Sequence, residues 1–350
     1  MPKTSFRFGV ELELKLENQQ GNMPFKNWSG LAEDVSQRLT EHGIRNHIHG
    51  KAAETYKEWF IIREVTIAVD PGSDQYGIEL VSPVFRAEEQ TWSTNLQIIF
   101  NVLHTYYTVH ESDTCSTHVH LSTAGTTLTE VNAVCLAEAA LYYEHAIDAL
   151  MPVWRAGGSH WCASNRDSHM FNGSEAAQRT KHPALAKALA AHHTAASLDT
   201  YLDIVRACYD SRIFTMDEAM NLRPAKAVRG KAQGKTADLV HGKVFKWNFG
   251  SLYKTSGTSK AIHRDGTVEF RQAPGSTRAE DAGAWVALAL TFFAGVLSSD
   301  GSLPAGTVNG ASVAELEALV QRGSQTLGWG NLGGLEEMLK CAQDFQVDEY

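Results

Sequence analysis

Hydrophobic and polar positions alternate without interruption in the first segment of the chain. From residue 6 to residue 16 every even-numbered position is a large apolar residue, and every odd-numbered position is charged or glycine. Because successive side chains of a strand point to opposite faces, this period of two predicts a β-strand with one buried and one polar face. Glu11 and Glu13 share the polar face.

Similar patterns predict the other elements. Runs rich in β-branched and aromatic residues predict strands at 58–69, 76–84, 115–122, 244–253 and 261–273. Apolar residues at helical spacing predict helices at 28–42, 92–108, 129–150, 183–209, 280–298 and 313–345. Turn-forming residues at 70–74 predict a hairpin between the second and third strands. This mixture predicts an α+β chain with a single catalytic domain over 1–350 and a helical segment at 300–350.

A basic segment interrupts this pattern in the second half of the chain. Residues 223–246 are rich in Lys, Arg and Gly and poor in large apolar residues, which predicts a mobile loop. Within it, residues 230–236 resemble a phosphate-binding loop, but the spacing is one residue short and no buried strand precedes it. We therefore reject a Walker motif. A solvated loop and a basic flap over an anionic ligand are the remaining alternatives.

One stretch is apolar enough to raise the question of a membrane span. Residues 282–297 are fewer than the ~20 apolar residues that a bilayer requires, and acidic residues flank them, which favours a buried helix. The first residues lack an apolar signal core, and the five cysteines are scattered without a C-x-x-C pair. These features predict a cytoplasmic location and no membrane partner.

The overall charge bears on the partners of the chain. Its 350 residues include 31 Lys and Arg against 40 Asp and Glu, which gives a formal net charge of -9. This acidic balance disfavours a nucleic-acid binder with a general basic surface. A hydrophobic share of 43% is ordinary for a globular protein.

Pairs of polar residues on single strand faces are the first candidates for chemistry. The Cβ atoms of Glu11 and Glu13 would lie about 6.6 Å apart, where two charges repel by about 2.5 kcal/mol at a dielectric constant of ~20. The pair faces either solvent or a cleft in which a divalent cation offsets the repulsion. His118 and His120 have the same spacing, and they either hold a metal or phosphate or are a chance pair among fifteen histidines.

Polar residues on two further strands extend this set. Glu269 and Arg271 share one face, and they form either a surface salt bridge or a site in which the planar guanidinium binds a phosphate oxygen. Glu79 is a single acid in an otherwise apolar strand and requires a partner. If these strands share a sheet, their polar faces form a floor for metal ions and phosphate. The chain has no H-E-x-x-H or G-x-S-x-G sequence, which disfavours zinc proteases and α/β-hydrolases.

Taken together, these motifs resemble those of a known family. In chain order they are Phe8-Gly9-Val10-Glu11-Leu12-Glu13, then Asp70 followed by Gly77-Ile78-Glu79-Leu80-Val81-Ser82-Pro83, then Cys115-Ser116-Thr117-His118-Val119-His120-Leu121-Ser122, and Val268-Glu269-Phe270-Arg271. The set resembles the putative amidoligase family, a branch of the carboxylate-amine ligases, from residue 6 to about residue 290. The segment 154–162 resembles the family's arginine and aromatic-cysteine element in part.

The resemblance implies a fold, cofactors and site residues. The implied fold is a curved antiparallel sheet, a glutamine-synthetase-like half-barrel with helices packed on its outer face, which holds ATP and Mg²⁺ on its concave face. The implied metal ligands are Glu11, Glu13, Glu79, His118 and Glu269. The implied nucleotide contacts are Glu11, His118, His120 and Arg271. Arg271 would contact the transferring phosphoryl group, and Asp70, with Asp74 as an alternative, would be catalytic.

These expectations define an ATP- and Mg²⁺-dependent ligase that activates a carboxylate as an acyl phosphate and couples it to an amine. The expected partners are a small-molecule or peptide carboxylate and an amine. We expect loops at 155–172 and 223–246 to contact these substrates. The sequence is compatible with a homo-oligomer. One alternative is a metal-dependent hydrolase that uses His118 and His120 with Glu79. The other is a non-catalytic nucleotide-binding protein of the same fold.

Overall fold

A large mixed sheet forms the centre of the molecule. The computed structural model describes residues 5–19, 25–50, 56–156, 161–171, 182–224, 239–241, 243–256, 259–299 and 310–347. The central sheet has nine strands in the order β10-β13-β7-β1-β4-β3-β2, and β5 and β6 also pair with β1. Its strands are β1 (Ser5–Asn18), β2 (Asn46–Ile48), β3 (Trp59–Arg63), β4 (Gln75–Val81), β5 (Phe85–Arg86), β6 (Tyr107–His110), β7 (Thr117–Ala124), β10 (Trp247–Asn248) and β13 (Val268–Phe270).

Two small hairpins and a set of helices complete the fold. The hairpins pair β8 (Leu222–Pro224) with β9 (Leu239–His241), and β11 (Tyr253–Ser256) with β12 (Ser259–Ile262). The α-helices are α1 (Trp28–Glu41), α2 (Thr91–Tyr106), α3 (Glu130–Tyr142), α4 (Glu144–Asp148), α5 (Val153–Ala156), α7 (Pro183–Thr194), α8 (Leu198–Ser211), α9 (Met216–Asn221), α10 (Ala279–Ser298), α11 (Val313–Leu327) and α12 (Gly334–Val347).

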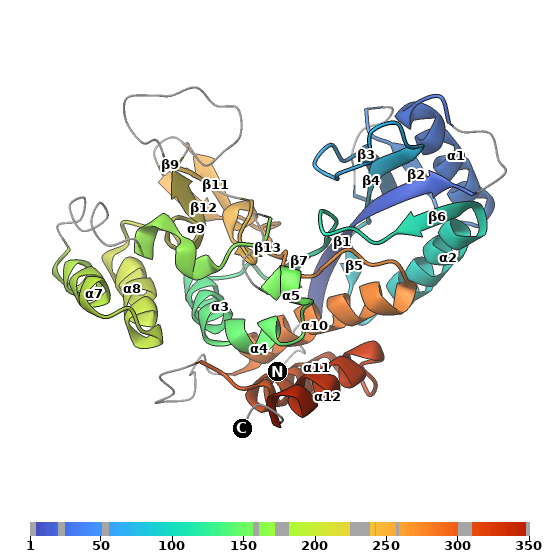
Figure 1. Cartoon of the computed structure of the whole chain (residues 1–350). Helices are drawn as coiled ribbons and strands as arrows, with labels where there is room; N and C mark the ends of the chain where they lie inside the picture. The colour runs from blue at the N-terminus through green and yellow to red at the C-terminus, as the bar shows by residue number, and fades with distance from the viewer. Residues whose placement is uncertain are drawn as a thin grey trace.

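The apolar face of the sheet is covered by helix α10. This helix packs against β1 and β7, and the rings of Phe6 and Phe293 meet edge to face at 5.9 Å. Figure 1 shows α10 below the sheet, with α11 and α12 beneath it. By length and composition α10 could cross a membrane, but 78% of its apolar window is buried inside the protein. The expected buried helix is therefore confirmed.

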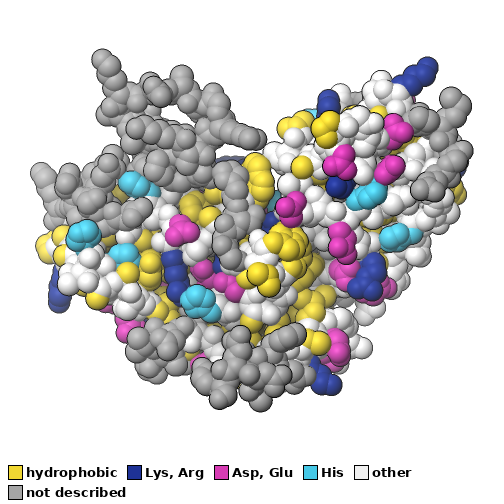
Figure 2. Space-filling model, viewed as in Figure 1, with side chains coloured by type: hydrophobic (Ala, Val, Ile, Leu, Met, Phe, Trp, Pro, Cys, Tyr) yellow, Lys and Arg dark blue, Asp and Glu magenta, His cyan; other side chains and the backbone are white. Residues whose placement is uncertain are grey.

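The opposite face of the sheet is open at its centre. Helices α7 to α9 and the hairpins stand on one side of it, and α1, α2 and strands β2 to β4 stand on the other (Figure 1). Figure 2 shows the surface hollowed between these two groups. The odd-numbered side chains of β1 lie on this face, because the even-numbered ones are buried against the helices. The sheet thus presents its polar residues to a cleft.

The fold class is confirmed in its main terms. The structure is α+β, and apart from the parallel pair β2 and β3, the named strand pairs of the central sheet are antiparallel. Helices pack on one face, and over the described residues the sheet does not close into a barrel. The strand predicted at 6–16 and the hairpin of the second and third strands are both present, as β1 and as β3 with β4.

Three segments predicted as continuous helices are each broken. The one predicted at 313–345 divides into α11 and α12, because α11 ends at Gly328 in the left-handed conformation. The helix predicted at 129–150 ends at Tyr142 and restarts as α4, because the carbonyl of Leu141 accepts from Arg166 and that of Tyr142 accepts from the Ala311 amide. The helix predicted at 183–209 divides into α7 and α8. A capping box at Ser197 satisfies the first amide groups of α8 and starts a new helix there.

The predicted basic loop is only partly described. Residues 225–238, with the rejected Walker-like sequence, lie outside the described residues. At the end of the segment the prediction is wrong. Lys246 is 2% exposed, and its Nζ donates to Asp148 and Glu144 at 2.6 and 3.2 Å. These acids come from α4, far away in sequence, so composition gave no sign that this lysine is buried.

Helices α10 and α11 cross so closely that one position requires glycine. A Cβ on Gly323 would overlap the carbonyl oxygen of Thr291 in α10. We expect Gly323→Ala to lower the free energy of unfolding by about 3 kcal/mol, because the helices must separate. Gly283→Ala is the control: a Cβ there meets nothing within 4 Å, so helix propensity should raise stability by about 1 kcal/mol. Denaturant unfolding of both variants checks this, and equal stabilities would contradict it.

Candidate metal centre and active site

The strand register brings the predicted site residues together on the open face. Glu11 of β1 lies opposite His118 of β7, and Glu13 lies opposite Glu79 of β4. On the other edge of β7, His120 lies opposite Glu269 of β13. Four strands that are distant in sequence therefore contribute to one cluster, which we call the Glu-His cluster: Glu11, Glu13, Glu79, His118, His120, Glu269 and Arg271.

Glu11 connects the two histidines. Its Oε2 lies 3.1 Å from His118 Nδ1, and its Oε1 lies 3.0 Å from His120 Nε2. Burial alone would raise the pKa of Glu11, but the charge of His120 and hydrogen bonds with both histidines hold this pKa well below its usual value. Glu11 is therefore an ionised carboxylate at the centre of the cluster.

Glu269 is the most deeply buried acid of the cluster. It is 2% exposed, and its two oxygens accept hydrogen bonds from the Asn248 amide, at 2.7 Å, and from Arg271. Burial raises its pKa, but Arg271 and His120 outweigh burial and lower the pKa to about 2. Both oxygens are held in fixed directions on the floor of the cleft.

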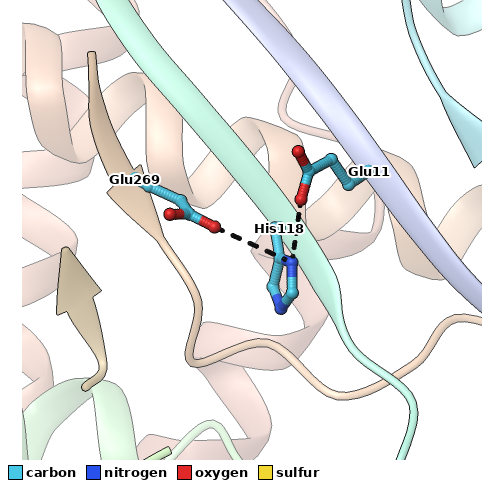
Figure 3. Close-up of side chains that lie close together, drawn as sticks. All are labelled: Glu11, His118 and Glu269. Carbon is cyan, nitrogen blue, oxygen red and sulfur yellow. Dashed lines mark hydrogen bonds and ion pairs between the residues drawn. The ribbon is translucent and has the colours of Figure 1, made fainter. Parts of the chain in front are cut away.

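His118 stands between two sets of ligand atoms. Glu11, His118 and Glu269 form one group, and Glu13, Glu79 and His118 form a second, each with its ligand atoms within 4.8 Å of one another. His118 Nδ1 faces Glu11 and Glu269, as Figure 3 shows, while its Nε2 lies 3.9 Å from Glu13 Oε1. That Nε2 is buried and has no hydrogen-bond partner. A metal ion in the second group would satisfy it.

The balance of charge in the cluster also fits bound cations. Burial raises the pKa of Glu79 to about 9, with contributions from the nearby charges of Glu11 and Glu13. Burial likewise raises the pKa of Glu13. Burial is thus the main cause of both shifts, and a divalent cation bound to these carboxylates would favour their ionised forms. The ligand set, rich in oxygen with a shared imidazole, fits a magnesium- or manganese-type site.

His120 has a different environment from His118. Its Nδ1 lies 3.4 Å from the Thr267 hydroxyl, and it belongs to neither ligand group among the described residues. Burial lowers its pKa, but Glu269 and Glu11 outweigh burial and raise the pKa to about 9. The H-x-H pair is thus split, since His118 faces both ligand groups while His120 supports Glu11 from the side.

Asp70 and Asp74 do not join the cluster. Both are exposed in the turn before β4, where the carbonyl of Asp70 accepts hydrogen bonds from Ser73. No described contact links either carboxylate to the Glu-His cluster. The catalytic role of Asp70 remains a prediction from the resemblance.

Sequence reasoning missed two residues that support the cluster. Asn248 holds Glu269, and Thr267 approaches His120. Asn248 lies on the predicted strand at 244–253, and the pairing of β10 with β13 places it opposite Glu269. Arg155, in the segment with a partial resemblance, is fully buried beneath Arg271.

The second ligand group can be tested through Glu79. We expect Glu79→Gln to leave the melting temperature nearly unchanged without metal, because burial raises the pKa of Glu79 to about 9 and a glutamine resembles the protonated carboxyl group. We expect it to lose most of the stabilisation that millimolar Mg²⁺ or Mn²⁺ gives the wild type. Thermal-shift titration measures both. Glu64→Gln, a neighbouring acid outside both groups, is the control, and equal metal responses in all three proteins would contradict the prediction.

Comparison with known proteins gives one finding. Residues 4–293 match the model of a family described as "putative amidoligase enzyme". A search of curated proteins gave no match. The match covers every residue of the Glu-His cluster and confirms the resemblance predicted from the motifs.

Proposed function

Because the chain belongs to the putative amidoligase family, we propose that it is an ATP- and Mg²⁺-dependent ligase that joins a carboxylate to an amine. Family membership indicates an amide-bond-forming enzyme. The dependence on ATP and Mg²⁺ is our extension of it. We further propose that the curved sheet is a half-barrel like that of glutamine synthetase and that the protein is cytoplasmic.

One observation carries the proposal: two ligand groups share His118 on the floor of an open cleft. Glu13, Glu79 and the unpartnered Nε2 of His118 would hold one Mg²⁺ ion. Glu11 and Glu269 would give carboxylate oxygens to a second ion, because a neutral imidazole has one free lone pair and His118 serves one ion at a time. Carboxylate oxygens are the ligands that Mg²⁺ prefers. Bound ions would neutralise the phosphates of ATP and the charge that develops on the transferring group.

The chemistry requires such a site. A carboxylate is inert toward an amine at neutral pH, so ATP must first convert it to an acyl phosphate, from which the amine then displaces phosphate. Negative charge accumulates in both steps, and the planar fork of Arg271 suits a phosphoryl oxygen. Asn248 and Arg271 fix Glu269, so this part of the floor is preorganised. The amine loses a proton to a base, for which Asp70 or a histidine is proposed.

The proposed partners follow from this chemistry. They are a small-molecule or peptide carboxylate and an amine, with no nucleic acid and no membrane. The hollow in Figure 2 opens above the sheet and would admit both substrates beside ATP.

The proposal is tested by amine-dependent ADP release. The purified protein is first screened by thermal shift with Mg-ATP against amino acids, polyamines and short peptides, and ADP release is then measured with the compounds that stabilise it. We expect release that requires Mg²⁺, a carboxylate and an amine together. Stabilisation by Mg-ATP without turnover over the whole panel would instead indicate a nucleotide-binding protein. Tightly bound zinc, with hydrolysis that needs no ATP, would indicate the hydrolase.

A further inference from the structure

Arg155 is a buried arginine whose role the proposed chemistry leaves unassigned. It lies in the short helix α5 and is 0% exposed. Its Nη2 donates to the carbonyl oxygens of Arg271 at 2.9 Å and Ala273 at 3.1 Å, and its Nε donates to that of Gln272 at 2.9 Å. One guanidinium thus holds three consecutive carbonyl groups.

The same side chain also reaches the neighbouring strand. Nη2 lies 2.6 Å from the Ser116 hydroxyl, directly before β7, while the three carbonyls follow directly after β13. Strand β7 carries His118 and His120, strand β13 carries Glu269, and Arg271 follows β13 directly. Arg155 therefore joins the end of β13 to the start of β7 at the base of the Glu-His cluster.

The segment that Arg155 holds has little ladder support of its own. Strand β13 ends at Phe270, one residue before Arg271. Beyond it the Arg271 amide donates to the Lys246 carbonyl at 2.9 Å, and the Thr117 amide donates to the Ala273 carbonyl at 3.3 Å. The Cys162 thiol lies 3.9 Å from the Gln272 carbonyl, and the Gly275 amide donates to the Cys115 carbonyl at 2.9 Å. Arg155 adds a bond to each of the three carbonyls of residues 271–273, and it alone among the described side chains bonds to the Arg271 carbonyl.

Stability alone does not explain an arginine at this position. No described carboxylate forms an ion pair with Arg155, and its Nη1 is buried without a hydrogen-bond partner. A buried cation without a direct counter-ion is costly, and apolar residues often replace buried charges at no loss of stability. What only arginine offers is a rigid planar fork of donors that can hold several carbonyls at once.

We propose that Arg155 is a positioning residue that fixes the direction of Arg271 toward Glu269 and His118. Arg271 Nη1 donates to Glu269 and lies 3.4 Å from His118 Nδ1, so a shift of its main chain would move it off both. The catalytic part of this inference rests on the proposed function. The positional part does not.

The test compares Arg155→Lys with wild type. Lysine keeps the charge and most of the volume but cannot reach three carbonyls and a hydroxyl. We expect kcat for amine-dependent ADP release to fall about 100-fold, because a misplacement of about 1 Å costs that much. KM for Mg-ATP should change little, since the metal ligands are untouched. Arg155→Met, which removes every donor, should lower kcat further, and the lysine variant decides if the methionine variant does not fold.

Hydrogen-deuterium exchange reports position without any substrate. In Arg155→Lys we expect faster exchange in the peptide covering residues 269–275 and unchanged exchange in β1. Arg206→Lys is the control, because Arg206 donates to the buried Glu138 of α3 but lies outside the cluster and outside the loops that are expected to meet the substrates. It should change neither kcat nor exchange at 269–275.

Each other outcome overturns a defined part of the inference. Unchanged kcat and unchanged exchange at 269–275 would show that Arg155 only fills space. Faster exchange throughout the chain with a lower melting temperature would show a general structural role. If the wild type releases no ADP with any acceptor, the proposed function fails, while the exchange experiment still decides whether Arg155 positions Arg271.

Discussion

Arg271→Ala should abolish amine-dependent ADP release, with a loss of at least about 1,000-fold in kcat. A guanidinium that neutralises a transferring phosphoryl group contributes on this scale. In the structure Arg271 is the cationic side chain that donates to the buried Glu269. ADP release at saturating Mg-ATP, carboxylate and amine measures the effect. Arg86→Ala removes an arginine paired with Glu88 on the surface and should retain full activity.

The same substitution should also destabilise the protein, and this effect must be separated from catalysis. Removing Arg271 leaves Glu269, 2% exposed, without its arginine, which typically costs 3–5 kcal/mol, so we expect a loss of roughly that size. In Arg271→Ala/Glu269→Gln the buried charge is gone as well. We expect this double variant to regain much of the lost stability and none of the activity. Recovery of ADP release in the double variant would show that Arg271 acts only as a partner of Glu269.

The sequence predicted the parts of the site that depend on local alternation. The period of two in β1 placed Glu11 and Glu13 on one polar face, and the same argument placed His118 with His120, and Glu269 with Arg271. The family motifs then indicated that these faces belong to one site. The structure confirms that grouping, because β1, β4, β7 and β13 share a sheet.

The sequence could not predict how the strands are aligned against one another. A shift of β7 by two residues along β1 would keep every side chain on its face but would move His118 away from Glu11. The register that sets His118 between two ligand groups depends on pairing between strands about a hundred residues apart. For the same reason the contacts of Lys246 and Arg155 were not predicted, since their partners lie on α4 and in the segment that follows β13.

A glycine spacing typical of dinucleotide-binding loops also shows that a sequence pattern does not identify a site without its structural context. Gly328, Gly330 and Gly333 have the spacing of a G-x-G-x-x-G sequence. In the structure they connect α11 to α12, and no strand precedes them. The motif binds a dinucleotide only where a strand leads into it and a helix follows. Spacing alone is therefore no sign of a nucleotide site here, and the argument for ATP stays with the cluster on the central sheet.

The two histidines of the H-x-H pair should respond differently to substitution. His118 is 2% exposed and belongs to both ligand groups, whereas His120 belongs to neither and contacts Glu11 from the side. We expect His118→Ala to abolish measurable Mg²⁺ binding and to lower kcat at least about 100-fold. We expect His120→Ala to weaken Mg²⁺ binding by only about 10-fold, as for a residue that orients a ligand. Calorimetric titration with Mg²⁺ and a non-hydrolysable ATP analogue measures both affinities.

This comparison also separates the ligase from the hydrolase. A hydrolase that holds one zinc ion with both imidazoles would lose its metal equally in the two variants, because each would supply one ligand. In the structure the two rings do not share a ligand group among the described residues. His110→Ala is a control, because His110 forms a hydrogen bond with Glu17 of β1 and lies outside both metal-ligand groups. Equal loss of metal in His118→Ala and His120→Ala, with His110→Ala unaffected, would contradict the arrangement on which the ligase proposal depends.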